Sequence, residues 1–159
     1  ADMNLEDHSG RTAMEMAISH PDGTFADTAH TVRLHDALSN LDPASCLEVV
    51  REAAAQRVLG LHRPDRRSGA TALFVAAERG LRVVLRGLVE AQGDVNCCND
   101  AAGKRQTPIF AAVKAGEESA STVRILLELR ADLEAQDSDG QTVLEAAFRA
   151  QVAEGQTQG

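Results

Sequence analysis

The sequence predicts an all-α fold in which short helix pairs repeat along the chain. Three observations predict it: one Thr-containing phrase recurs, apolar residues follow it at helical spacing, and the apolar residues are mostly small aliphatics. Of the 159 residues 43% are hydrophobic, yet only four are Phe and none is Trp or Tyr. Such a composition suits closely packed helices better than a twisted sheet, which usually recruits aromatic and β-branched residues.

The recurring phrase is a turn-forming stretch, usually containing Gly, followed by Thr, an apolar residue and an Ala-rich helix. Each Thr stands where a helix N-cap belongs, so its hydroxyl is expected to accept a hydrogen bond from a free backbone amide. The threonines are separated by 59, 36 and 35 residues, so the first interval contains an extra segment. The four copies are DHSGRTAMEMA at 7–17, RRSGATALFVAAERG at 66–80, GKRQTPIFAAVKAG at 103–116 and DSDGQTVLEAAFRA at 137–150, with Thr12, Thr71, Thr107 and Thr142.

A second helix is expected behind the phrases, because apolar residues form one face over 83–89 and over 123–129. A third such face runs over 47–58. Polar stretches follow the second helices at 93–106 and 131–141, and their turn-forming residues predict hairpin-like connectors. Glycines are expected to end the preceding helices at Gly80 and Gly116.

These phrases resemble the ankyrin repeat, whose unit of about 33 residues contains a turn and two antiparallel helices. Residues 66–98 match the family pattern without a gap. The family's His after the apolar residue is absent, so the turns are expected to be less firmly hydrogen-bonded. The matching residues are Gly69, Thr71, Leu73, Ala76, Ala77, Gly80, Val84, Leu88, Val89, Asp94, Val95 and Asn96, and the residues in place of the His are Glu15, Phe74, Phe110 and Glu145.

The resemblance implies a single ankyrin-type solenoid segment over residues 1–159. Residues 21–41 are interpreted as an insertion with a helix of its own, and insertions in solenoids often map to the binding face. Neither end has the polar capping repeat that a solenoid needs, so further repeats or a partner domain are expected before Ala1. The predicted units are a partial repeat at 1–20, the insertion at 21–41, repeats at 42–65, 66–98 and 99–136, and a partial terminal repeat at 137–159.

Charge and composition exclude several functions. The formal net charge of −8 and the pI of about 5.1 argue against nucleic acid as a partner, because phosphate binding requires clustered Lys and Arg. No stretch is long and apolar enough to span a membrane. Cys46, Cys97 and Cys98 form a poor disulfide framework, which favours an intracellular setting. The cytoplasm is expected, and an organelle reached after removal of a transit peptide stays open as the alternative. No metal, cofactor or catalytic site is expected, because the histidines lack zinc spacing and no nucleotide-binding or nucleophile motif occurs.

The function implied by the resemblance is recognition of another protein. Similar repeats bind partners through the turn tips and the exposed side of the first helix, which together line a concave groove. Two roles stay open: a scaffold or adaptor that binds its partner reversibly, and a segment built permanently into a large complex. The expected contact residues are Arg67, Ser68, Ala70, Glu78, Arg79, Asp100, Lys104, Arg105, Gln106, Lys114, Ser138, Asp139, Gln141 and Arg149.

Overall fold

The structure is a computed structural model that describes residues 26–40, 42–55, 64, 68–99, 103–115 and 119–155. Across these residues it contains helices and turns, with two isolated β-bridges in place of strands. The all-α prediction is therefore confirmed. The helices are α2 (Ala26–Asn40), α3 (Pro43–Ala55), α4 (Ala72–Glu78), α5 (Arg82–Glu90), α6 (Pro108–Lys114), α7 (Ser119–Glu128) and α8 (Val143–Gly155).

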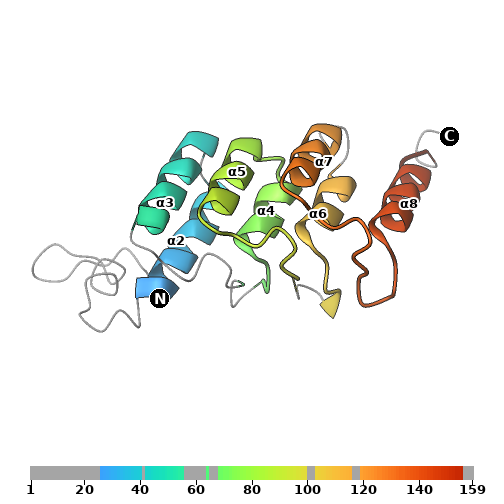
Figure 1. Cartoon of the computed structure of the whole chain (residues 1–159), viewed down its shortest axis with the longest axis horizontal. Coiled ribbons are helices and arrows are strands. Elements are labelled where there is room, and N and C mark those ends of the chain that lie inside the picture. Colours follow the sequence, from blue (N-terminus) through green and yellow to red (C-terminus); the bar gives the residue numbers. More distant parts are fainter. Residues whose placement is uncertain are drawn as a thin grey trace, which may run out of the picture.

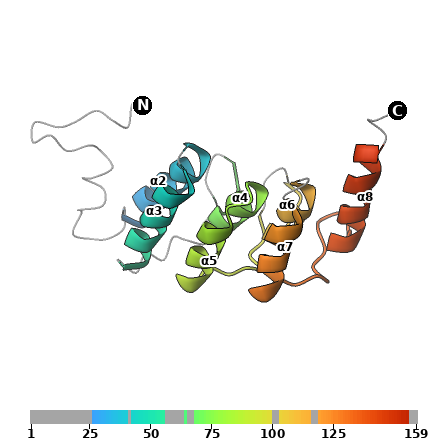
Figure 2. The ribbon, with the colours of Figure 1, turned by 90° about the horizontal axis from the view of Figure 1, so that it is seen from above.

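The helices stand in two layers, and successive pairs follow one another along the long axis of the molecule (Figures 1 and 2). The inner layer consists of α2, α4, α6 and α8, each packed on the next. The outer layer consists of α3, α5 and α7, which pack on one another and on their inner partners. The chain therefore forms a solenoid in which each pair contacts mainly its neighbours.

The predicted Thr caps stand at the start of three inner helices, but they act differently. The Thr71 hydroxyl accepts from the Phe74 amide at 3.3 Å, as expected. At α8 the Thr142 hydroxyl accepts from the Glu145 amide at 3.4 Å, and the Glu145 carboxylate accepts from the Thr142 amide at 2.8 Å, which is a capping box. The hydroxyl of Thr107 makes no cap hydrogen bond, which corrects the prediction for α6. The physical reason is that the Phe110 amide donates instead to the Thr107 carbonyl, at 3.0 Å.

Three helices end in the same left-handed turn. Gly80, Gln92 and Arg130 have φ values of 65°, 66° and 68°. In each case the following amide reaches back to a carbonyl five residues earlier, as in Gly93 N to Leu88 O at 2.8 Å. Gly80 thus ends α4 as predicted, whereas the predicted end at Gly116 lies outside the described residues.

Hairpin-like turns connect the pairs, as the polar stretches predict. Antiparallel bridges close them at Asn99 with Gln106 and at Gln136 with Thr142. Asn96 joins one turn to the next unit, because its side-chain oxygen accepts from the Asp132 amide at 2.8 Å. These bonds hold neighbouring turns side by side.

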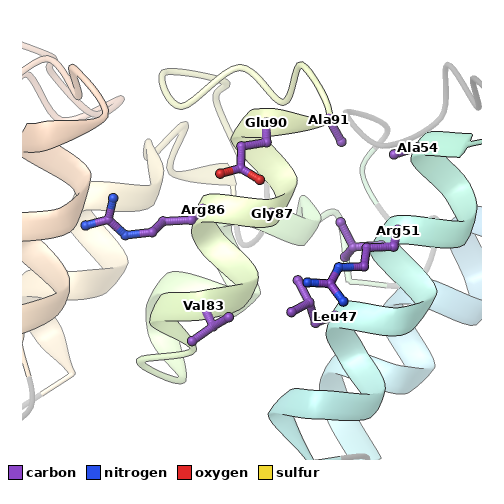
Figure 3. A pocket seen from close by; sticks show the side chains of 9 residues that line it. Leu47, Arg51, Ala54, Val83, Arg86, Gly87, Glu90 and Ala91 are labelled. Carbon is purple, nitrogen blue, oxygen red and sulfur yellow. The ribbon is translucent and has the colours of Figure 1, made fainter.

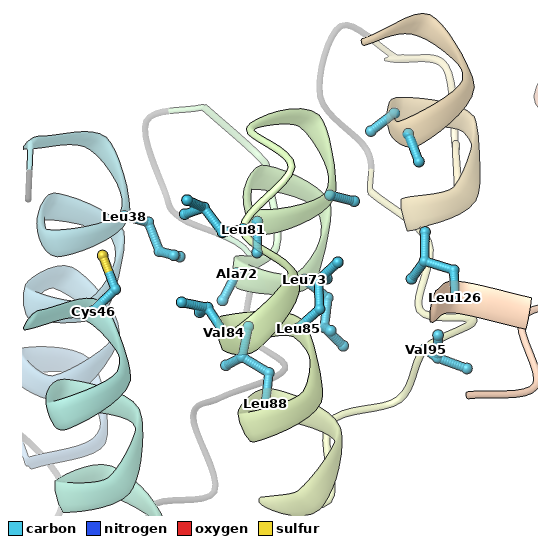
Figure 4. Packing of buried hydrophobic residues seen from close by; sticks show 14 of the residues in the cluster. Leu38, Cys46, Ala72, Leu73, Leu81, Val84, Leu85, Leu88, Val95 and Leu126 are labelled. Atoms are coloured by element: carbon cyan, nitrogen blue, oxygen red, sulfur yellow. The ribbon is translucent and has the colours of Figure 1, made fainter. Parts of the chain in front are cut away.

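The core is a continuous layer of small aliphatic side chains between the two helix layers (Figure 4). Leu73, Ile109 and Leu126 are at most 1% exposed, and Phe110 is fully buried. The predicted small aliphatic core is present. At Gly93 the backbone lies so close to the end of α5 that an added Cβ atom would be 2.6 Å from the Leu88 carbonyl oxygen.

Residues 26–40 and 43–55 form the helix pair α2 and α3, in the region where the sequence predicts an insertion at 21–41 with a helix of its own and a repeat at 42–65. Leu34, Ala37 and Leu38 of α2 are buried, and α2 packs on both α3 and α4. A helix with this apolar face is part of the stack, so we interpret α2 and α3 as one repeat unit. The boundaries predicted at 66–98, 99–136 and 137–159 stay predictions, and the partial repeat at 1–20 lies outside the described residues.

Candidate binding surface on the inner helix layer

A polar hollow of about 370 Å³ opens where the turn before α6 meets α6 and α8. Six of the predicted contact residues line it together, although they come from two units of the repeat. They are Lys104, Gln106, Lys114, Asp139, Gln141 and Arg149.

The repeat itself brings two of these cations together. Lys114 follows Thr107 by seven residues, and Arg149 follows Thr142 by seven, so the two side chains occupy the same position on neighbouring inner helices. Because α6 packs directly on α8, this register places them on the same side of the stack. Glu78 holds the equivalent position on α4, so the sign of the charge changes along the inner layer.

A chain of hydrogen bonds organises the wall of the hollow. Lys114 Nζ donates to Gln106 Oε1 at 2.9 Å, and Gln106 Nε2 donates to Asp137 Oδ2 at 3.2 Å. The other oxygen of Asp137 accepts from the amides of Asp139 and Gln141, at 2.9 and 3.0 Å. The Asp137 carboxylate is therefore committed to fixing the turn before α8.

The pKa values of two groups reflect this arrangement. Burial lowers the pKa of Lys114 below its ordinary value of 10.5, and the positive charge of Lys104 lowers it further, against the opposing effect of Asp137. Burial by itself raises the pKa of Asp137, but hydrogen bonds donated by Gln141, Gln106 and Asp139 outweigh it and hold the pKa below 3.8. Burial thus opposes the charged form of both groups, and it is outweighed only at Asp137.

The remaining predicted contact residues, considered together with Gln106, divide into three groups. Ser68, Glu78, Arg79, Arg105 and Ser138 are exposed, as expected of a contact surface. Ala70 and Gln106 are each only 7% exposed, which corrects the expectation that their side chains are free to meet a partner. Ala70 packs into the start of its unit, and Gln106 is held between Lys114 and Asp137. Arg67 and Asp100 lie outside the described residues.

Sequence reasoning missed three residues of the hollow. Asp137 was read only as part of a turn phrase, yet it is the group that positions Gln106. Ala146 and Ala150 form the apolar part of the lining. Their spacing of four residues on α8 is a signal for a shared helix face, but the sequence does not say which surface that face borders.

A second hollow, of about 350 Å³, lies between α3 and α5 in the outer layer (Figure 3). Gly87 lines it and allows α3 to approach α5 closely, because an added Cβ would lie 2.7 Å from Leu47 Cδ1. Arg86 on its rim points away from α3 and pairs with Glu128 of α7 at 2.5 Å. None of the predicted contact residues lines this hollow, so the inner surface is the stronger candidate.

Exposed apolar side chains also mark the last helix. Leu144, Phe148 and Val152 are 67%, 69% and 44% exposed and follow one another at four-residue spacing along α8. The residues equivalent to Leu144 in the two preceding units, Leu73 and Ile109, are almost fully buried. The first position of this line is therefore covered in the two preceding units and open on α8.

Comparison with known proteins identifies the fold family. A family model described as ankyrin repeats (3 copies) matches residues 73–155, which is 83 of the 159 residues. The chain belongs to the ankyrin-repeat family. The ankyrin-repeat chain is also 42% identical over 81 residues to protein phosphatase 1 regulatory subunit 12A of Mus musculus and, equally, of Rattus norvegicus.

The aligned part covers 51% of the ankyrin-repeat chain and about 7% of the length of these relatives. Their similarity therefore concerns a short part of each relative and not its remaining sequence. Family membership supports a role in protein interaction. Among the described residues, no helix is both long and apolar enough to cross a membrane.

Proposed function

We propose that this ankyrin-repeat segment binds a partner protein through its inner surface, formed by the turns and the exposed side of α4, α6 and α8. The observation that carries the proposal is the convergence of six predicted contact residues on one hollow built from two repeats. The mixed charge of the residues that line the hollow fits a polar interface of moderate size.

We further propose that the segment acts as an adaptor without catalytic activity of its own. Its relatives are named as regulatory subunits of a phosphatase, and a regulatory subunit acts by contacting other proteins. By analogy, the segment would bring its partner to a larger complex. The partner's identity is open, and a phosphatase is one candidate that the capture experiment below includes.

The test is affinity capture from a lysate of cells that express the protein, followed by quantitative mass spectrometry. The inner-surface variant carries Arg79→Glu, Asp139→Lys and Arg149→Glu, and the control carries Arg124→Glu on the outer helix α7. Both variants change the net charge by −2, so a general charge effect is matched. All four side chains are exposed, and unchanged circular dichroism will verify the fold of both variants.

We expect the inner-surface variant to lose partners that the Arg124→Glu control retains. Equal loss in both variants would mean that net charge governs capture. Retention of every partner by the inner-surface variant would contradict the proposed surface.

A second candidate function, a segment fixed within a large assembly, is favoured by the exposed apolar line on α8. Side chains such as Phe148, which is 69% exposed, are usually covered in a stable complex. Light scattering coupled to size exclusion distinguishes the two roles. An adaptor is expected to be monomeric at micromolar concentration, whereas an assembly segment is expected to self-associate in a way that Leu144→Ser with Phe148→Ser abolishes.

A further inference from the structure

The polar hollow contains both lysines of the chain. The sequence has 16 basic residues but only Lys104 and Lys114 are lysines, and both line the same hollow with Arg149 as a third cation. This concentration of positive charge is notable in a chain of net charge −8.

These three cations have no carboxylate partner among the described residues. The ion pairs in the described part of the chain are Arg33 with Glu52 and Arg86 with Glu128. Lys114 donates one hydrogen bond to Gln106, which fixes its ammonium group and leaves two further N–H donors. Three positive groups thus face one space with unused hydrogen-bonding capacity.

Asp137 offsets this positive charge only in part. Both oxygens of Asp137 already accept hydrogen bonds, from Gln106 and from the amides of Asp139 and Gln141. The pKa of Lys114 is lowered by burial and by Lys104, so its ammonium is charged in an unfavourable setting. A bound anion would relieve this cost, because an opposite charge stabilises the ammonium form.

We propose that the hollow binds a glutamate or aspartate side chain of the partner protein, with Lys104, Lys114 and Arg149 as the binding cations. This inference rests on the proposed function, because the carboxylate belongs to the protein that the inner surface recognises. Ala146 and Ala150 line the hollow beside the cations and give the methylene groups of such a side chain an apolar contact. Arg149 has the planar donor geometry that suits a carboxylate.

The charges favour a carboxylate over a phosphorylated side chain. Three cations and the two carboxylates of Asp137 and Asp139 give the hollow a formal charge of +1. A single negative charge balances that value. A phosphate group with nearly two charges would be repelled by the exposed Asp139 at the rim.

Lysine-selective carbon labelling tests the proposal directly, because the chain gives only two lysine Cε signals. A Lys104→Arg variant assigns them. The probes are short peptides of equal length that carry glutamate, glutamine or phosphoserine at their centre. We expect the glutamate peptide to shift both Cε signals in a saturable way and to raise the pKa of Lys114, while the glutamine peptide leaves them unchanged.

Substitutions define the site. Arg149→Gln and Lys114→Gln are each expected to weaken glutamate-peptide binding about fivefold, the upper end for an exposed ion pair, whereas Arg124→Gln on α7 leaves the affinity unchanged. Absence of a shift at millimolar glutamate peptide overturns the proposal, as does equal weakening by Arg124→Gln. Tighter binding of the phosphoserine peptide overturns the choice of a carboxylate.

The proposed function can fail independently of this inference. If Lys114→Gln with Arg149→Gln retains the partners that the inner-surface variant loses, the function stands and the carboxylate site is wrong. If the glutamate peptide binds as expected but no inner-surface variant loses a partner, the site stands and the proposed function is wrong.

Discussion

Replacing Phe110 with alanine is expected to destabilise the stack strongly. The side chain is fully buried in α6, which packs on α4, α7 and α8. A buried Phe covers about 200 Å² of apolar surface, which corresponds to about 5 kcal/mol at ~25 cal/mol per Å². Measured Phe→Ala losses in cores, about 3–5 kcal/mol, include partial collapse of the cavity, so we expect a loss in that range.

Phe148 provides a matched control on the neighbouring inner helix. It is 69% exposed, so its covered third contributes about 1.5 kcal/mol. The better helix propensity of alanine offsets about 0.5 kcal/mol of that loss. Phe148→Ala is therefore expected to lower the free energy of unfolding by about 1 kcal/mol.

Urea denaturation followed by far-UV circular dichroism is the suitable assay, because the chain has no Trp or Tyr to report by fluorescence. We expect the midpoint to fall markedly for Phe110→Ala and to fall much less for Phe148→Ala. Stack proteins can unfold in stages, so the slopes of the transitions must be compared as well. Similar midpoint changes in the two variants would refute the assignment of Phe110 to the core.

Three further predictions concern the turns. Gly93→Ala is expected to cost about 1–3 kcal/mol of stability, because the new Cβ would lie 2.6 Å from the Leu88 carbonyl oxygen; an unchanged urea midpoint would count against this contact. Gln92→Gly is expected to stabilise by about 0.5–1 kcal/mol, since glycine relieves the left-handed backbone at φ 66°, and a lower midpoint would be the opposite result. The pKa of Asp137 is below 3.8 in the folded chain, where amides such as that of Gln141 outweigh the effect of burial. The stabilising effect of the Asp137 carboxylate is thus present above pH 3.8 and is lost as pH falls through the folded pKa. Asp137→Asn is therefore expected to make the urea midpoint less sensitive to acid. An unchanged pH profile would contradict the role given to this carboxylate.

Local sequence signals predicted most helix starts, but not how each cap is made. Thr71 and Thr142 accept as N-caps, whereas the amide that Thr107 would serve is taken by its own backbone carbonyl. Because the family's His is absent from every repeat, the sequence predicted less firmly hydrogen-bonded turns. At α8 its replacement Glu145 completes a capping box instead, so the effect of that departure depends on the side chain that fills the position.

Sequence by itself determined the class of fold and the register of the stack. The Thr spacing of 36 and 35 residues and the helical apolar faces identify equivalent positions, because each repeat must bury the same face against its neighbour. That register also places Lys114 beside Arg149, which is why the predicted contact residues converge.

Tertiary structure decided which residues are free to act. It made α2 part of the stack, because its Leu34 and Leu38 are covered by α3 and α4, contacts that no local pattern can reveal. It buried Gln106 and committed Asp137 to the turn. The accessible charges of the hollow are therefore Lys104, Lys114, Asp139 and Arg149. Burial and hydrogen-bond partners depend on residues distant in the chain, and for that reason the binding chemistry of the surface follows from packing and not from sequence spacing alone.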